Sequence, residues 1–213
     1  MQSRHEVWIR IVNDIRNCRL CPLHSYRRNP VPGEGSLDTD VVFLGEAPGR
    51  KEDETGRPFV GAAGQLLNKL ISDIGLDRSK VFITNVVKCR PPNNRDPKDE
   101  EIRACSVHTN AILSLIKPKV IVTLGNHAGK YVFEFLGNRK WLGVTKARGK
   151  VYEISLRLGF NVKVIPTYHP AAALYNPQLR HNLESDFKLI SKALSEVREG
   201  RKAMTLLDFF RSR

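Results

Sequence analysis

Four short runs of apolar and β-branched residues, separated by longer segments of helical character, constrain this chain more than any other feature. The runs are VVFLG (41–45), VFITN (81–85), VIVTLG (120–125) and VKVIPT (162–167). Apolar runs of this length are typical of strands buried on both faces of a parallel sheet. Helices are expected around them at residues 3–16, 64–74, 98–116, 126–136 and 178–197. The alternation predicts an α/β fold, a three-layer α/β/α sandwich with a central four-stranded parallel sheet.

The length of the chain suits one folded domain. Its 213 residues, of which 41% are hydrophobic, can fill a substantial core. We expect a single domain over residues 1–198 and a basic, apolar tail over 199–213. No apolar run approaches the roughly 20 residues that a membrane span requires, and the first ten residues lack the apolar stretch of a signal peptide. We therefore expect an intracellular, monomeric protein of the cytoplasm or nucleoid, without a membrane partner.

The net charge indicates a class of partner. Lys and Arg total 35 against 22 Asp and Glu, which gives a formal charge of +13. A field of this sign attracts polyanions, and nucleic acid is the commonest polyanion bound by basic domains. A surface that is merely basic remains an equal alternative on composition alone.

Three polar motifs lie where the expected strands end. GEAPG begins at the end of the first run, Asn85 ends the second, and YHP follows the last. Ligands of parallel sheets gather beyond the carboxyl ends of the strands, so we expect these motifs to share one site. Residues 86–97, VVKCRPPNNRDP, are rich in Pro and Asn and are typical of a functional loop.

The four cysteines are Cys18, Cys21, Cys89 and Cys105. Disulfides are uncommon in intracellular proteins of this size, which favours a metal site built from all four thiolates. Zinc and an iron-sulfur cluster both remain open, although zinc sites usually have a second C-x-x-C pair. A thioredoxin-like redox pair is less favoured, because C-x-x-C here follows a helix instead of opening one after a strand.

The neighbouring motifs carry a resemblance. GEAPG followed by ED and GRPFVG, then TNVVKCRPPNNRDP, then HP after the last run, resembles the family 4 uracil-DNA glycosylases, which are the iron-sulfur members of their superfamily. The match covers residues 14 to about 190 in the family's order. It implies a [4Fe-4S] cluster on Cys18, Cys21, Cys89 and Cys105. It also implies hydrolytic removal of uracil from single- or double-stranded DNA, which leaves an abasic site and free uracil.

A glycosylase of this kind needs a pocket for a base flipped out of the DNA. The resemblance places the ring of Phe59 over that base. Asn85 can accept a hydrogen bond from uracil N3–H and donate one to O4 with a single side chain. Cytosine presents the opposite pattern and would leave buried donors facing donors, at roughly 1–3 kcal/mol for each unpaired group.

Three further groups are expected around the base. A fixed N–H of His169 aimed at O2 would stabilise the uracil anion as the bond breaks, and amides of Gly45 to Ala47 would add donors. Ala47 stands where the better-known non-metal family has an aspartate, so Glu46 is the nearest ionisable candidate for water activation, with a role in ordering the loop as the alternative. Glu52 resembles the position that faces uracil C5 and would exclude thymine. The remaining histidines, assigned structural roles, are His5, His24, His108, His127 and His181.

Contacts to DNA are expected from the last motif and from basic side chains. HPAAALYNPQLR places Leu174 and Tyr175 where this superfamily inserts a loop into the minor groove, and an apolar wedge there fills the space left by the flipped base. Candidates for phosphate contacts are Arg90, Arg95, Lys98 and Arg180.

The end of the chain, GRKAMTLLDFFRSR, concentrates apolar residues. Leu206, Phe209 and Phe210 resemble the peptide motif by which replication and repair proteins bind the DNA sliding clamp. Ala203 stands where that motif usually has glutamine, and packing of the tail on the domain is the alternative. Two other classes of function also remain: a uracil-binding module that does not cleave, and a zinc-stabilised adaptor that uses the basic face alone.

Overall fold

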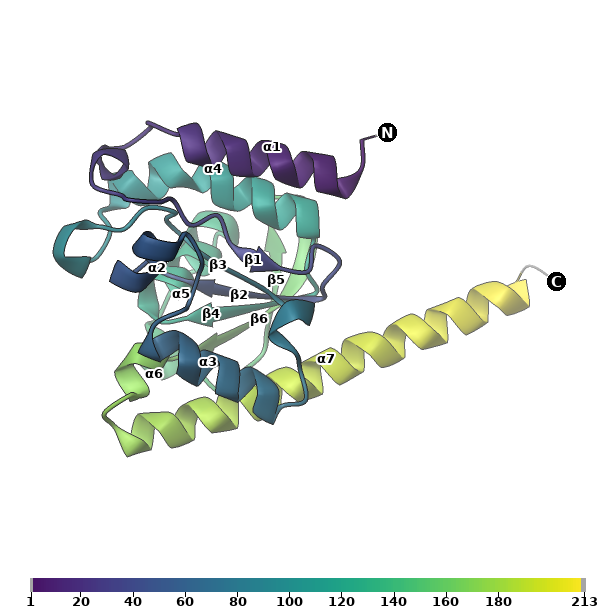
Figure 1. Cartoon of the computed structure of the whole chain (residues 1–213). Helices are drawn as coiled ribbons and strands as arrows, with labels where there is room; N and C mark the ends of the chain where they lie inside the picture. The colour runs from purple at the N-terminus through teal and green to yellow at the C-terminus, as the bar shows by residue number, and fades with distance from the viewer. Residues whose placement is uncertain (1, 212–213) are drawn as a thin grey trace.

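The computed structural model describes the backbone of residues 2–211 and the side chains of residues 2–200. Within this part of the chain six strands form one sheet in the order β1-β3-β2-β4-β6-β5 (Figure 1). The strands are β1 (Glu34–Gly35), β2 (Val41–Gly45), β3 (Phe82–Asn85), β4 (Val120–Leu124), β5 (Tyr152–Leu156) and β6 (Phe160–Thr167). Strands β3, β2, β4 and β6 are mutually parallel, which confirms the predicted central sheet.

The expectation of four strands is corrected at both edges. β1 pairs antiparallel with β3, and β5 pairs antiparallel with β6. β1 has only two residues, too few to leave a pattern in the sequence. β5, YEISL, has one exposed face and therefore alternates between buried and exposed side chains, unlike the fully buried runs that mark the central strands.

Helices cover both faces of the sheet, as Figure 1 shows. The α-helices are α1 (Arg4–Asn17), α2 (Arg50–Thr55), α3 (Ala62–Asp73), α4 (Asp99–Ile116), α5 (Asn126–Lys130), α6 (Val144–Ala147) and α7 (Pro177–Arg211), counted over the described backbone. A π-helical segment, η4 (Tyr131–Leu136), continues α5, and short 3-10 turns include η5 (Pro170–Ala173). α1 and α4 contribute to one core cluster, whereas α3 and α7 contribute to the other. The three-layer prediction is therefore confirmed.

Strand β2 is apolar throughout because both of its faces are buried. Val42 and Leu44 point into the core under α1 and α4, while Val41 and Phe43 point into the core under α3 and α7. All four side chains are buried, because successive residues of a strand face opposite sides of the sheet. A strand between two helical layers cannot keep a polar face.

Helix α7 is longer than predicted, because it continues without a break past Gly200 to Arg211. Its last turns extend beyond the sheet that the helix covers (Figure 1). The side chains of Leu206, Phe209 and Phe210 lie outside the described residues. Among the helices that the structure describes, none combines the length and the apolar character needed to cross a membrane.

Candidate active site

The carboxyl ends of the parallel strands open onto a cavity of about 330 Å³. Its walls come from the turn after β2, the α2 to α3 segment, the end of β3, the loop before α4, and the start of η5. The lining residues are Glu46, Ala47, Pro48, Gly49, Glu52, Phe59, Ala63, Asn85, Pro91, Asn94, Arg95, His169 and Ala171. The motifs that the sequence placed at strand ends therefore meet in one cavity, as expected for a parallel sheet.

Asn85 ends β3 beside Gly45, its register partner on β2. Its side chain is 1% exposed, and its Oδ1 has no hydrogen-bond partner among the described residues. A β-carbon on Gly45 would overlap this oxygen and the ring of Phe59. Buried amide oxygens are almost always paired in folded proteins. The free acceptor therefore marks a place where a ligand N–H can bind.

Phe59 lies in the loop before α3 with a φ of 52°, in the left-handed region that residues other than glycine rarely adopt. Glu52 holds this loop, since its Oε1 accepts hydrogen bonds from the amides of Val60 (2.8 Å) and Gly61 (2.9 Å). Gly64 also permits the conformation, because a β-carbon there would overlap the Phe59 carbonyl. Strained backbone held by its surroundings is typical of functional sites.

His169 follows β6 and faces the cavity with a fixed ring. Its Nδ1 accepts a hydrogen bond from the amide of Ala171 at 3.2 Å. Burial lowers the pKa of His169 to about 4, although the negative charge of Glu52 opposes the shift. The ring is therefore neutral near pH 7, with its proton on Nε2. A neutral imidazole of this tautomer can donate to a ligand oxygen.

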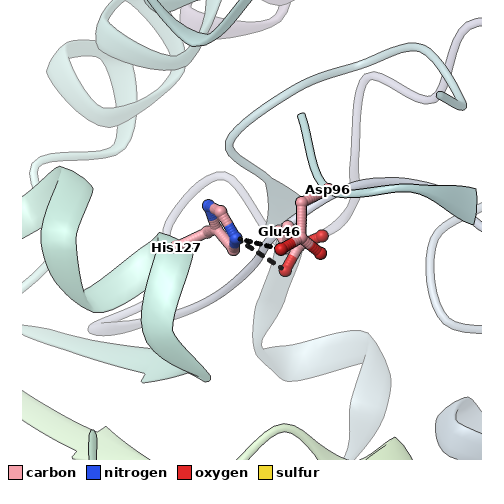
Figure 2. Close-up of side chains that lie close together, drawn as sticks. All are labelled: Glu46, Asp96 and His127. Atoms are coloured by element: carbon pink, nitrogen blue, oxygen red, sulfur yellow. Dashed lines mark ion pairs between the residues drawn. The ribbon is translucent and has the colours of Figure 1, made fainter. Parts of the chain in front are cut away.

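Glu46 lies at the cavity wall beside His127 and Asp96, two residues that the sequence did not place at the site (Figure 2). The Nε2 of His127, the second residue of α5, lies 3.8 Å from Glu46 Oε2 and 3.2 Å from Asp96 Oδ2. Burial raises the pKa of Glu46, the positive charge of His127 lowers it, and the charge of Asp96 raises it. His127 was expected to be structural. Its position just beyond the end of β4 is the sequence signal that could have placed it here.

The four cysteines gather around a second, small cavity between α1 and α4. Cys18 and Cys21 follow α1, Cys89 lies in the loop after β3, and Cys105 lies in α4; all four described thiols are free. Burial raises the pKa of Cys105 to about 12, and a thiol that becomes a metal ligand gives up its proton when the metal binds.

Other polar groups already point at the sulfur atoms. Arg27 Nη1 donates to Cys89 Sγ at 3.2 Å, and the amide of Lys88 donates to Cys105 Sγ at 3.3 Å. His108 lines the same cavity, and its buried Nε2 has no partner within the described part of the chain. Four thiols, N–H donors aimed at sulfur and an unpaired nitrogen fit a group with sulfur ligands.

The residues expected to contact DNA differ in their surroundings. Tyr175, just beyond η5, is 93% exposed, whereas Leu174 packs partly on the core beneath α7. Arg95 donates two hydrogen bonds to the buried carboxylate of Glu101 at 2.6 and 2.9 Å. Arg90 and Arg180 contact Asn94 and Glu184, and each keeps part of its side chain at the surface.

Comparisons with known proteins agree with this arrangement. The sequence model described as "UDG: Uracil DNA glycosylase superfamily" matches residues 32–198. The type-4 uracil-DNA glycosylase of Sulfurisphaera tokodaii is 53% identical over 85% of this chain and 82% of its own length. The enzymes of the same name from Archaeoglobus fulgidus and Saccharolobus solfataricus are 50% and 49% identical, over 93% of this chain and 96% and 89% of their own lengths. Conserved length, shared identity and a cavity built from the family's motifs lead to one conclusion: this chain belongs to the type-4 uracil-DNA glycosylases of the uracil DNA glycosylase superfamily.

Proposed function

We propose that the protein flips uracil out of DNA and hydrolyses its N-glycosidic bond, leaving an abasic site and free uracil. The unpaired Oδ1 of Asn85, in the cavity that also holds Phe59 and His169, is the observation that carries this proposal. A buried acceptor without a partner suits a ligand that brings an N–H. The type-4 names of the relatives give the same substrate.

Asn85 reads the base in this proposal. Its Oδ1 accepts from uracil N3–H, and its amide nitrogen donates to O4. A cytosine in the same orientation presents an acceptor at N3 and a donor at N4, so both contacts fail. Each unpaired buried group costs roughly 1–3 kcal/mol, which is enough to exclude the normal base from the pocket.

Phe59 and His169 act on the same base from two sides. The Phe59 ring supplies the flat apolar face on which the flipped base stacks, and this contact offsets part of the cost of flipping. His169 donates from Nε2 to O2 and stabilises the anion that forms as the bond breaks. A neutral imidazole suits this role, because it keeps its proton while the negative charge on O2 grows. We assign further donors to the backbone of Gly45, Glu46 and Ala47.

We assign activation of the attacking water to Glu46. Its carboxylate lies at the cavity wall with 30% of the side chain exposed, and no carboxylate is available at Ala47. His127 opposes the rise in the pKa of Glu46 and thereby favours the carboxylate, which is the form that binds or deprotonates water.

Glu52 has a separate assignment as the group that excludes thymine. Its side chain lines the cavity and is fixed there by the amides of Val60 and Gly61. A fixed carboxylate beside C5 of the base would meet the thymine methyl group, which cannot take a hydrogen bond. This assignment rests on the family resemblance and on the position of the side chain.

We propose that Cys18, Cys21, Cys89 and Cys105 hold a [4Fe-4S] cluster, as the family resemblance implies. The donor set fits, because N–H groups of Arg27 and Lys88 already point at two of the sulfur atoms. When bound, the cluster supplies a rigid link between four segments of chain. Those segments are the end of α1, the turn after it, the loop beyond β3 and helix α4.

DNA is the partner, and we place the protein inside the cell because its substrate is there. Leu174 and Tyr175 form the wedge that enters the minor groove, with Arg90, Arg95 and Arg180 near phosphates.

We also propose that the tail, residues 199–213, binds the DNA sliding clamp through Leu206, Phe209 and Phe210. Deletion of residues 203–213 should abolish clamp binding in calorimetry and leave excision on short oligonucleotides intact; a large loss of thermal stability would instead favour a packed tail.

The activity is tested with an end-labelled oligonucleotide that contains one uracil. Incubation with the protein without added metal, followed by alkali, should break the strand at the uracil. No break should appear before alkali, because hydrolysis of the glycosidic bond leaves the backbone intact. An oligonucleotide with cytosine at the same position is the matched control. Absence of alkali-dependent breaks at uracil would exclude the proposed function.

A further inference from the structure

Lys88 is a buried basic residue that lines the cysteine cavity. It lies in the loop after β3, three residues beyond Asn85 and next to Cys89, and it is 1% exposed. Lysine is seldom fully buried, because its ammonium loses the hydration that water provides. A lysine kept inside a core therefore needs compensating partners.

The ammonium of Lys88 is bound to the end of β3. Its Nζ donates to Thr84 Oγ1 at 2.9 Å and to the carbonyl oxygen of Asn85. The hydroxyl of Thr84 donates to the Pro32 carbonyl at 2.7 Å, which leaves its oxygen as an acceptor for Lys88. The ammonium thus holds the main-chain carbonyl of Asn85 and the side-chain hydroxyl of Thr84, at the end of the strand that leads into the uracil pocket.

The backbone of Lys88 is bound on the opposite side, toward the cysteines. Its amide donates to Cys105 Sγ, and its side chain lines the cysteine cavity with Cys89 and Cys105. A cluster held by four thiolates is negatively charged and compensates the buried ammonium. Arg27 provides a second cation, but it contacts Cys89 and the carbonyls of Ile15 and Arg16 at the end of α1. Of these two cations, Lys88 is the one whose charged group is bound to the end of β3.

The side chain of Asn85 depends on this arrangement. No hydrogen bond from a described residue holds its Oδ1, so the position of the oxygen depends on its packing beside Gly45 and on the main chain that carries it. That main chain is fixed at its carbonyl by Lys88.

We propose that Lys88 is a positioning residue that couples the cysteine-bound cluster to uracil recognition by Asn85. The cluster compensates the ammonium, the ammonium holds the Asn85 carbonyl, and the Asn85 carboxamide reads the base. This inference rests on the proposed function of the pocket. It gives the cluster a role in recognition beyond joining segments of chain, although the cluster contacts no substrate.

Lys88→Met tests the coupling in the cluster-loaded protein, because methionine keeps most of the length and loses the charge. Thr84→Val removes one acceptor of the ammonium and leaves every cysteine contact in place. Lys69→Met is the matched control, since Lys69 only pairs with Asp73 on the surface of α3. The three measurements are visible absorption per protein, affinity for free uracil, and the change in visible circular dichroism of the cluster on adding uracil.

We expect Lys88→Met to weaken uracil affinity about tenfold or more, as loss of a buried charged hydrogen bond does. Thr84→Val should weaken it in the same direction while absorption per protein stays at the wild-type value. Wild type and Lys69→Met should show the change in visible circular dichroism on adding uracil, and Lys88→Met and Thr84→Val should both lose it. If Lys88→Met is insoluble, the same measurements on Thr84→Val decide the question.

Wild-type uracil affinity and a retained dichroism change in cluster-loaded Lys88→Met or Thr84→Val would overturn the coupling. That result would leave the proposed function intact, provided that the wild type still excises uracil. A wild type without excision would instead overturn the function itself. The two failures are therefore distinguishable.

Discussion

The ring of Phe59 packs against the imidazole of His169, with ring centroids 5.5 Å apart and planes inclined by 30°. The two residues are far apart in the sequence, one in the loop before α3 and one just after β6. Both side chains line the cavity. Their contact also holds the imidazole against the Phe59 ring, and burial lowers the pKa of His169 to about 4.

His169→Ala should lower the single-turnover rate of uracil excision by roughly 100 to 1000-fold, because it removes a donor to the developing anion. His181→Ala, an exposed substitution on α7, is the matched control and should keep the wild-type rate. Circular dichroism in the far ultraviolet should show both variants folded. A near-normal rate for His169→Ala would contradict the assignment of His169 as the anion-stabilising group.

The pH dependence of excision should follow the protonation of Glu46. Burial raises the pKa of this carboxyl, so the active carboxylate is lost as pH falls through a midpoint above the usual glutamate value of about 4.3. His127→Ala removes a positive charge that lowers the pKa, and the acid limb of the single-turnover rate should therefore move to higher pH. If the acid limb has the same midpoint in His127→Ala as in wild type, water activation by Glu46 is contradicted.

Gly45→Ala should damage the pocket without a change in any polar group. The added β-carbon overlaps Asn85 Oδ1 and the Phe59 ring, so both must shift. We expect a loss of uracil affinity of at least about tenfold, since small displacements of reading groups are costly. Gly61→Ala is the control, because its nearest neighbour, Glu52 Oε1, is at 3.5 Å and leaves room. Equal affinities for the two variants would show that Gly45 is not needed for this geometry.

Cys89→Ala should release the cluster and lower the yield of soluble protein together, because one thiolate joins the loop after β3 to the other three ligands. The purified wild type should be yellow-brown with broad visible absorption, and iron and sulfide should be measurable in it. A colourless wild type with bound zinc would contradict the [4Fe-4S] assignment while leaving the four-cysteine site in place.

The sequence was sufficient for the parts of the site that lie at strand ends. Asn85 and His169 could be placed because Asn85 ends an apolar run and His169 follows one, and the carboxyl ends of parallel strands meet at one edge. The edge strands could not be placed, since β1 is two residues long and the β5 pattern is that of a half-exposed strand. Helix α2 was not predicted, because all six of its residues are polar and leave no apolar period.

Contacts between side chains distant in the sequence could not be predicted from residue patterns. His127 and Asp96 meet Glu46 only because α5 and the loop before α4 converge on the turn after β2. Lys88 carries no signal of burial, since lysine in a Pro- and Asn-rich loop is normally solvated. Its partners, Thr84 and the Asn85 carbonyl, are close to it in sequence, but only the folded loop turns its ammonium back toward them.

The most direct test of the account is the single-turnover rate of uracil excision by Asn85→Asp. The substituted carboxylate can still accept from N3–H but cannot donate to O4, and its charge opposes the anion that forms on the base. We predict a fall of roughly 100-fold or more relative to wild type, with the visible absorption of the cluster unchanged. A rate within about threefold of wild type, in protein that retains the cluster, would contradict the claim that Asn85 reads uracil in this cavity.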